Sequence, residues 1–315
     1  MKLRAYLLML LVVAVWGSTF VVVKGALAEA TPGAFNLARM TLAFAVLAIA
    51  YHRYWREIRR WQVAAGAFVG FCLAIGYQFQ TTGLARTTPS KSAFITGLMV
   101  VMVPLLSTIP GIRPPGSMPP RWNAFLGAAL ALIGIVLLTA PAATLAPGPA
   151  TWQGQAAHLL PDMASINLGD MLTLGCAIGF AFHCLALSHV SPRIGFQPLA
   201  LLQVGFCALF MALSLPLIEH PQIAWTPRVV TALGVSAVLA TAVAFSIQSW
   251  VQSVLPPTHT ALLLTLEPVF AWITSFLVMG ERLGIRPASG ALMILAGIAL
   301  TELMPQPRLA TAHEA

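Results

Sequence analysis

Long apolar stretches, separated by short polar or charged segments, are the feature of this sequence that most restricts its fold. The first stretch runs from Ala5 to Val23 without a charged residue, and about 20 apolar residues in a helix span a bilayer core. Only 8% of the 315 residues are charged and 58% are hydrophobic, whereas about a quarter of the residues in soluble domains are charged. No alternating strand pattern appears, so the sequence predicts an all-α integral membrane protein.

Ten apolar segments predict ten transmembrane helices. They cover residues 4–24, 34–51, 63–84, 92–110, 122–140, 169–190, 196–218, 228–251, 258–279 and 286–304. The longest linker, 141–168, contains no Lys or Arg and divides the chain into halves. We therefore expect a first five-helix repeat over 1–140, an external linker over 141–168, a second five-helix repeat over 169–305 and a cytoplasmic tail over 306–315.

Positive charges predict the orientation of the first half. With a cytoplasmic N-terminus, eight of its loop cations lie inside and three lie outside, as the positive-inside rule requires. The inner group is Lys2, Arg4, Arg53, Arg56, Arg59, Arg60, Arg113 and Arg121, and the outer group is Lys24, Arg86 and Lys91. The cations of the second half show no such bias, so its orientation follows from counting spans. We expect a multi-pass protein of the bacterial inner membrane with both termini in the cytoplasm.

The two halves share short sequence patterns. The string GAALALIGIVL at 127–137 matches GALMILAGIAL at 290–300, with both glycines at equal spacing. Two further matches occur in the same order, and these pair Tyr77, Gln80, Pro89 and Ala93 with Phe245, Gln248, Pro257 and Ala261, and Gly17 and Phe20 with Gly179 and Phe182. Because each half has an odd number of spans, repeats of this kind must be inverted relative to each other, which is a common plan among transporters.

The basic residues and the cysteines point to no further partner or cofactor. The largest basic run, at 53–60, lies between two apolar segments and is interleaved with aromatic residues, which is typical of a cytoplasmic loop, so we exclude nucleic acid as a partner. The four cysteines lie inside apolar segments without C-x-x-C or C-x-x-H spacing, so neither a zinc site nor a disulfide framework is predicted. We expect no cofactor.

Polar side chains inside the apolar segments mark candidate binding surfaces, because such groups are costly in lipid. Tyr77, Gln80 and Thr81 share one helical face, and Phe245, Gln248 and Ser249 belong to a similar face in the eighth span. These groups could line a cavity for an amphipathic solute, or they could bond between helices for packing alone. We favour the cavity because the faces occur in equivalent spans of both halves.

Charged and aromatic residues within the spans give further candidates, each with two interpretations. Glu267, followed by Pro268, could bind a cationic solute or take up a proton, or it could be a permanent partner of Arg39 or of a hydroxyl. Arg39 could bind a substrate carboxylate, although snorkelling or a structural ion pair is more common. His183 could titrate or bond between helices, and Trp16 could contact the solute or simply pack.

Several strings resemble the EamA-type branch of the drug/metabolite transporter superfamily. They are WGSTF at 16–20 with Arg39, the stretch from Tyr77 to Leu84, AFITGL at 93–98 with Pro104, LEPVFA at 266–271 and GERL at 280–283. The resemblance implies two five-helix repeats around a central cavity, and it adds Trp16 and Thr19 to the cavity candidates. Pro104 stands later in its helix than Pro268 does, and the first half has no counterpart of GERL, so no gating role is transferred.

These observations favour a secondary transporter that moves amino acids or similar amphipathic metabolites, and drugs as a further class, out of the cytoplasm. No P-loop pattern GxxxxGK[ST] is present that would indicate ATP-driven pumping. The alternatives are an intramembrane enzyme, for which no GxSxG or HExxH pattern is found, and a membrane scaffold that transports nothing. The expected partners are a small solute and the lipid bilayer, while the oligomeric state is open.

Overall fold

The structure is a computed structural model that describes residues 2–113, 121–139, 167–254 and 263–303. Among these residues every regular element is helical, apart from an isolated bridge between Ala30 and Ile223. The first half contains α1 (Lys2–Ala26), α2 (Pro32–Ala50), η1 (His52–Glu57), α3 (Arg60–Leu84), α4 (Pro89–Gly97), α5 (Met99–Leu106) and α6 (Trp122–Thr139). The second half contains α8 (Leu168–Val190), α9 (Phe196–Ile218), α10 (Pro227–Gly234), η3 (Val235–Val243), α11 (Ala244–Val254), α13 (Glu267–Met279) and α14 (Ile285–Leu303).

The prediction of a helical membrane protein is confirmed. In the described part of the chain, seven helical segments are long and apolar enough to cross a membrane. Three of the ten predicted spans correspond to shorter apolar helices, Trp122–Leu138, Glu267–Met279 and Ile285–Leu300, so the number of ten crossings stays a prediction. The linker predicted at 141–168 lies almost entirely outside the described residues, as does the predicted tail over 306–315.

Several helices begin earlier than the hydropathy pattern suggested. α4 begins at Pro89 and α10 at Pro227, each directly after a threonine whose hydroxyl accepts a hydrogen bond from the third backbone amide of the helix. A threonine N-cap followed by proline is a strong helix start, because proline already has helical φ and lacks the N–H that would be unpaired there. These starts place Thr88 and Thr226 at one end of their helices.

Two predicted spans are interrupted. The fourth predicted span consists of α4 and α5, with Leu98 between them, and the ninth has its described helix α13 beginning only at Glu267. Pro268 occupies the second position of α13, where a missing N–H costs nothing. The eighth predicted span is continuous but contains a π-helix, η3, between α10 and α11. All three irregular segments contribute to the cavity described below or adjoin it.

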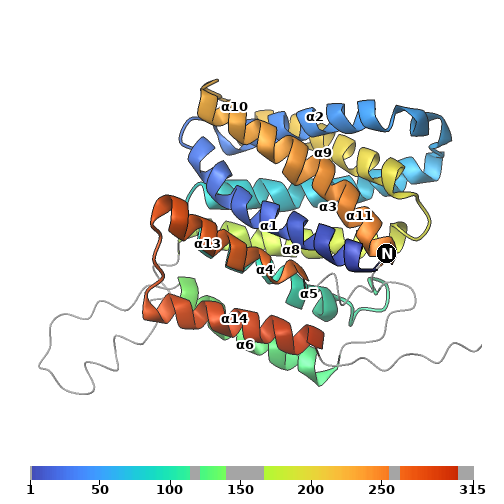
Figure 1. Cartoon of the computed structure of the whole chain (residues 1–315). Helices are drawn as coiled ribbons and strands as arrows, with labels where there is room; N and C mark the ends of the chain where they lie inside the picture. Colours follow the sequence, from blue (N-terminus) through green and yellow to red (C-terminus); the bar gives the residue numbers. More distant parts are fainter. Residues whose placement is uncertain (1, 114–120, 140–166, 255–262, 304–315) are drawn as a thin grey trace, which may run out of the picture.

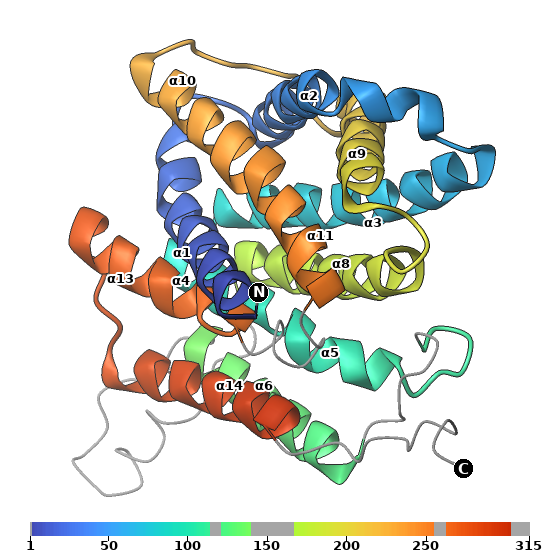
Figure 2. The ribbon, with the colours of Figure 1, turned by 45° about the vertical axis from the view of Figure 1, so that its right-hand side comes forward.

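The helices form three groups, as Figures 1 and 2 both show. α6 and α14 lie side by side at one flank, α2, α9 and α10 lie at the opposite flank, and α1, α3 and α8 run between them. The α6–α14 pair is in backbone contact. A Cβ on Gly134 would lie 2.6 Å from the carbonyl oxygen of Gly290, and a Cβ on Gly297 would lie 2.4 Å from that of Gly127.

These glycine contacts are reciprocal. In the sequence match between the halves, Gly127 is equivalent to Gly290 and Gly134 is equivalent to Gly297. In the structure, Gly134 contacts Gly290 and Gly127 contacts Gly297. Replacing both glycines of one contact by their equivalents in the other half gives the second contact. A two-fold relation between the helices produces such a self-complementary contact. The packing therefore fits an architecture of two repeats.

Candidate solute-binding cavity

A cavity lies among helices from both halves of the chain, between the two flanks. It is lined by residues of α1, α2, α3, α4, α5, α8, α11 and α13, together with Leu264. The lining residues are Trp16, Thr19, Phe20, Val23, Arg39, Leu73, Tyr77, Gln80, Thr81, Leu84, Thr96, Met99, Phe180, His183, Cys184, Phe245, Gln248, Leu264 and Glu267. Apolar walls with a few polar groups are typical of sites for small organic ligands.

The structure brings together ten of the eleven residues that the sequence suggested. Trp16, Thr19, Arg39, Tyr77, Gln80, Thr81, His183, Phe245, Gln248 and Glu267 all line this cavity. The exception is Ser249, which is not part of the lining and whose buried hydroxyl has no hydrogen-bond partner in the part of the chain that the structure describes. Whether the lining residues bind a solute stays a prediction.

Arg39 is buried in the cavity wall, with only 3% of its surface exposed. Its Nε donates to Thr241 Oγ1 at 2.9 Å and its Nη2 donates to the Tyr77 hydroxyl at 3.1 Å. The guanidinium carbon lies 4.5 Å from the centre of the Tyr77 ring. Among the described residues Arg39 has no carboxylate partner, so the guanidinium neither snorkels to the membrane surface nor forms the structural ion pair considered from the sequence.

Aromatic rings form one wall of the cavity around Phe245. The centre of the Phe245 ring lies 5.6 Å from that of Trp16, 6.5 Å from that of Tyr77 and 6.1 Å from that of His183. Tyr77 also contacts Phe180 edge-on, with the ring centres 5.2 Å apart. Tilted and edge-on pairs of this kind are favourable and fix the ring planes, so the wall is pre-organised.

The π-helix η3 provides hydrogen-bond acceptors for two side chains of the cavity, Trp16 and Arg39. The Trp16 indole nitrogen donates to the carbonyl oxygen of Ala240, within η3, at 2.8 Å. Thr241 donates from its hydroxyl to the carbonyl oxygen of Ser236 at 2.7 Å, five residues earlier, and accepts from Arg39. A π-turn closes over five residues instead of four, so it redirects the carbonyl and hydroxyl groups of one turn toward neighbouring helices.

Amide side chains supply polar groups on both halves of the wall. Gln248 Oε1 is buried and has no hydrogen-bond partner among the described residues, which leaves an acceptor in the cavity lining. Gln80, on α3 in the first half of the chain, also lines the cavity and is half-buried. Thr81 is held in place because its hydroxyl donates to Asn36 Oδ1 at 2.9 Å, and Asn36 in turn donates to the Tyr77 carbonyl oxygen at 3.0 Å. Thr19 bonds back to its own helix, to the carbonyl oxygen of Trp16.

His183 and Glu267 occupy different environments. His183 Nε2 lies 2.9 Å from Gln203 Oε1 on α9, so this ring is hydrogen-bonded between helices and also lines the cavity. Glu267 is the first residue of α13 and is half-buried. Its carboxylate forms no hydrogen bond or ion pair with any residue that the structure describes. The two oppositely charged groups of the wall, Glu267 and Arg39, are therefore not paired with each other.

Sequence reasoning missed nine lining residues. They are Phe20, Val23, Leu73, Leu84, Thr96, Met99, Phe180, Cys184 and Leu264. Helical spacing could have identified several of them, because Leu73 and Leu84 extend the face of Tyr77, and Val23 continues that of Thr19. Within the described residues, no group of three or more His, Cys, Asp or Glu side chains could hold a metal ion.

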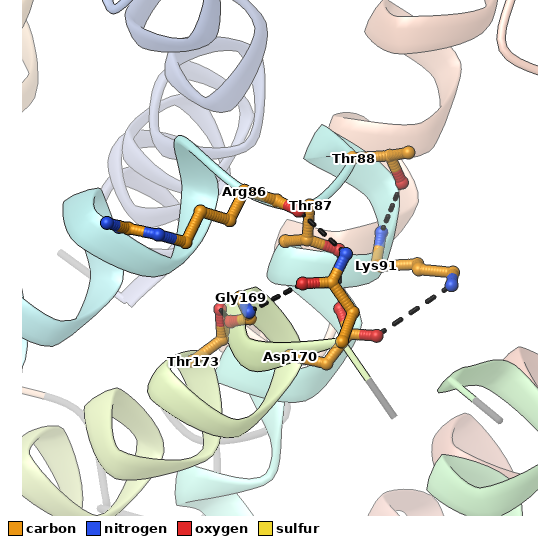
Figure 3. A network of polar contacts seen from close by, with 8 residues as sticks. Arg86, Thr87, Thr88, Lys91, Gly169, Asp170 and Thr173 are labelled. Atoms are coloured by element: carbon orange, nitrogen blue, oxygen red, sulfur yellow. Dashed lines mark hydrogen bonds and ion pairs between the residues drawn. The ribbon is translucent and has the colours of Figure 1, made fainter. Parts of the chain in front are cut away.

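A second hollow lies at one end of the helices, and some of its lining residues directly follow cavity-lining residues in the sequence. Lys24, Ala85, Arg86, Thr87, Thr88, Pro89, Lys91, Asn167, Ser275, Met279 and Glu281 line it. Figure 3 shows the polar network beside it, in which Thr87 donates to Asp170 on α8, and Lys91 Nζ lies 3.8 Å from the same carboxylate. The Asn167 amide group donates to the Arg86 carbonyl oxygen at 2.8 Å. This network joins the start of α4 to the start of α8.

Comparisons with known proteins point to a transporter. The model of the EamA-like transporter family matches residues 3–140 and 167–303, which is one match for each half. An uncharacterized transporter of Archaeoglobus fulgidus is 28% identical over 311 residues, and the aligned region covers 96% of this chain and 87% of the relative. A solved structure, described only as the crystal structure of a protein, has a TM-score of 0.63 at 17% identity and covers 96% of this chain and 98% of its own. That structure is similar in fold alone.

Proposed function

The chain belongs to the EamA-like transporter family, and from that premise we propose that it is a secondary transporter of small amphipathic metabolites. The solute class includes amino acids, with drugs as a further class, and the direction is export from the cytoplasm. Transport proceeds by alternating access, in which the cavity opens to one side of the membrane at a time. The transporter described from Archaeoglobus fulgidus supports this proposal at the level of the broad function.

The unpaired charges of Arg39 and Glu267 carry the argument for the solute class. Both residues line the same cavity, and neither is neutralised by another described side chain. A charge that lines a largely apolar cavity without a partner is costly, so a solute that supplies the opposite charge is favoured. A carboxylate can accept two parallel hydrogen bonds from a guanidinium, and an ammonium group can bind Glu267. A zwitterion would satisfy both groups together.

The remaining wall favours a solute that also has an apolar or aromatic part. The rings of Trp16, Phe180 and Phe245 offer flat apolar surfaces, while Gln248 Oε1 offers an acceptor that no other described residue occupies. A wholly polar solute would leave the rings without contacts, and a hydrocarbon would leave the amide unsatisfied. An amphipathic molecule matches both parts of the wall.

The proposed topology has ten crossings in two inverted five-helix repeats, with both termini in the cytoplasm of a bacterial inner membrane. Single cysteines in place of Gln155 and Trp61 test it, in a background where the four native cysteines are replaced. A membrane-impermeant maleimide added to intact cells is expected to label the position 155 variant but not the position 61 variant. The reverse pattern would reject the orientation, because five crossings from a cytoplasmic start end outside.

A flux assay with purified protein in liposomes tests the transport function itself. Candidate solutes are first ranked by the rise in melting temperature that they cause, since a ligand that binds only the folded protein stabilises it. The best zwitterionic solute is then loaded in radiolabelled form, and its exit is compared with that from protein-free liposomes. Exit at the protein-free rate for every solute that raises the melting temperature would favour a binding or scaffold role. A chemically altered solute would favour an enzyme.

A further inference from the structure

The helices around the cavity can be divided into two bodies, the first joined by glycine backbone contacts and the second by such contacts together with hydrogen bonds between side chains. The first body is α1 with α13, because a Cβ on Gly17 would lie 2.6 Å from the carbonyl oxygen of Glu267 and 2.8 Å from the nitrogen of Ala271. A hydrogen bond of 3.2 Å between the Ser18 and Thr274 hydroxyls joins the same two helices. Such close approach leaves no space between the two backbones, so we treat these helices as one body.

The second body is α3, α4 and α8. A Cβ on Gly83 would lie 2.7 Å from the carbonyl oxygen of Gly169, and the reverse contact is equally close. The network of Figure 3 ties the start of α4 to α8 through Asp170, and deeper in the pair Thr96 Oγ1 lies 3.6 Å from Cys176 Sγ. We call the boundary between the two bodies the seam.

The seam separates the cavity from the second hollow. Val23 and Leu84 line the cavity from opposite sides of the seam, and the residues that follow them, Lys24 and Ala85, line the second hollow. A solute that leaves the cavity at this end must pass between these positions. The exit therefore requires the two bodies to move apart here.

Hydrogen bonds cross the seam at this end in two places. Lys24 Nζ donates to the carbonyl oxygens of Leu84 at 2.8 Å and Ala85 at 3.0 Å. Glu281 Oε2 accepts from the Ser90 hydroxyl at 2.8 Å and, at 3.4 Å, from the Ser90 backbone N–H in the first turn of α4. On its own side of the seam, the same oxygen accepts from the Ser275 hydroxyl at 2.5 Å.

The backbone at the end of α13 aims Glu281 across the seam. Gly280 has a φ of +68° and ends α13 in the left-handed conformation, which glycine adopts without strain. The chain turns back at this point, and the carboxylate of the next residue reaches the N-terminus of α4. A negative group is favourable there, because the free amides and the helix dipole are positive. Both serines are fully buried, so water does not compete for these bonds.

We propose that Glu281 is a latch that closes this end of the cavity by holding α4 against α13, and that its bonds to Ser90 break once in each transport cycle. The proposal rests on the proposed transport function, because only a transporter has to open this end. Glycine backbone contacts join α1 to α13 and α3 to α8, whereas at this end the seam is crossed by the side-chain bonds of Lys24 and Glu281. Glu281 belongs to the GERL string at 280–283, to which no role could be assigned from the sequence.

Accessibility of the cavity tests the latch without any solute. A single cysteine at Val23, which is 4% exposed, is labelled with a maleimide in detergent after the native cysteines are replaced. Glu281→Ala should raise the labelling rate about tenfold, because hydrogen bonds to a charged group are lost, and Glu281→Gln should raise it less. Glu29→Ala is the matched control, since that carboxylate binds Thr226 and Arg228 outside the seam. A rate equal to that of the control would overturn the latch.

A metal bridge tests whether the latch must open during transport. In the variant Ser90→Cys/Ser275→Cys, the two thiolates and the retained Glu281 carboxylate can bind Cd²⁺, which prefers soft sulfur ligands. Cd²⁺ binding is followed by the ultraviolet absorbance of the sulfur–metal bond, and flux is measured in the same liposomes. We expect Cd²⁺ to stop flux in the double variant, a chelator to restore it, and each single variant to be insensitive. Bound Cd²⁺ with undiminished flux would reject the latch and leave the transport function intact.

Where the absorbance shows no Cd²⁺ bound, the two serine positions are not close enough to share one carboxylate oxygen, and that result also contradicts the latch. If no solute is transported by the unmodified protein, the accessibility measurement at Val23 still decides whether Glu281 closes the cavity. The failure of the latch and the failure of the proposed function are thus separate results.

Discussion

Arg39 is fixed against Tyr77 in two ways, with its guanidinium carbon 4.5 Å from the centre of the ring and its Nη2 donating to the ring hydroxyl at 3.1 Å. The second bond, from Nε to Thr241, comes from the other half of the chain. A planar group held at two points has a defined orientation, and less side-chain entropy is lost when it binds a further acceptor. We therefore predict that Arg39 binds a solute carboxylate in the cavity.

Arg39→Lys is expected to weaken the binding of carboxylate-bearing solutes by about 10- to 100-fold, because a hydrogen bond to a charged group contributes about 1.5–3 kcal/mol and lysine cannot form two parallel bonds. Isothermal titration with a zwitterionic solute and with its methyl ester measures the effect. The ester should bind the variant and the unmodified protein almost equally. An equal loss for acid and ester would indicate a structural role for Arg39, and Arg56→Lys in the exposed η1 segment is the control.

Glu267→Gln is expected to reduce the flux of solutes that carry an ammonium group about tenfold or more, while neutral analogues keep most of theirs. Glutamine has nearly the same shape and can still accept a hydrogen bond, but it has no charge to neutralise the ammonium group. The measurement is uptake into liposomes of an amino acid and its N-acetyl derivative. A variant that transports both as the unmodified protein does would make Glu267 a structural residue.

Trp16→Leu is expected to weaken the binding of solutes with an aromatic ring about 2- to 10-fold, since an aromatic pair contributes about 0.5–1.5 kcal/mol beyond its buried area. The indole bond to Ala240 is lost as well, so a second variant, Trp16→Phe, separates ring contact from that bond. Trp16→Phe should retain the preference for aromatic over aliphatic solutes. Competition between phenyl- and alkyl-bearing analogues gives the ratio, and an unchanged ratio in Trp16→Leu would exclude the ring contact.

The sequence predicted the cavity residues where a helix is regular, because the 3.6-residue period decides which side chains share a face. Tyr77, Gln80 and Thr81 on α3 illustrate this, since all three line the cavity. Ser249 does not line the cavity, although Phe245 and Gln248, which also follow the π-helix η3, do. Gln248 and Ser249 are adjacent on α11, so their side chains leave the helix in different directions, and only that of Gln248 lies in the cavity lining.

The surroundings of Arg39 could not be predicted for a different reason. Its bonding partners lie 38 and 202 positions away in the sequence, on helices whose packing depends on the whole fold. The sequence favours snorkelling or a structural ion pair, because these are the more common states of an arginine within a span. Arg39 instead bonds to Tyr77 and Thr241, and only the tertiary structure shows these bonds. The same holds for Glu281, whose partner Ser90 lies 191 positions away.

The reciprocal glycine contacts of α6 and α14 lead to a prediction about stability. Gly134→Val places a branched side chain where even a Cβ would lie 2.6 Å from the carbonyl oxygen of Gly290, so the two helices must separate. Overpacking of this kind typically costs about 1–3 kcal/mol, and we expect a melting temperature several degrees lower in detergent.

Gly234→Ala is the matched control for Gly134→Val, because this glycine ends α10 and has nothing within 4 Å of an added Cβ. Alanine forms helices better than glycine by about 1 kcal/mol, so the control should melt at the same temperature or slightly higher. Gly290→Val should lower the melting temperature as Gly134→Val does, because the contact is shared. The double variant should lose less than the sum of the two single losses, since helices that one valine has already separated tolerate the second. Strictly additive losses would mean that the two glycines do not share one interface. The reciprocal contact of α6 and α14 would then no longer support a two-fold relation between the halves.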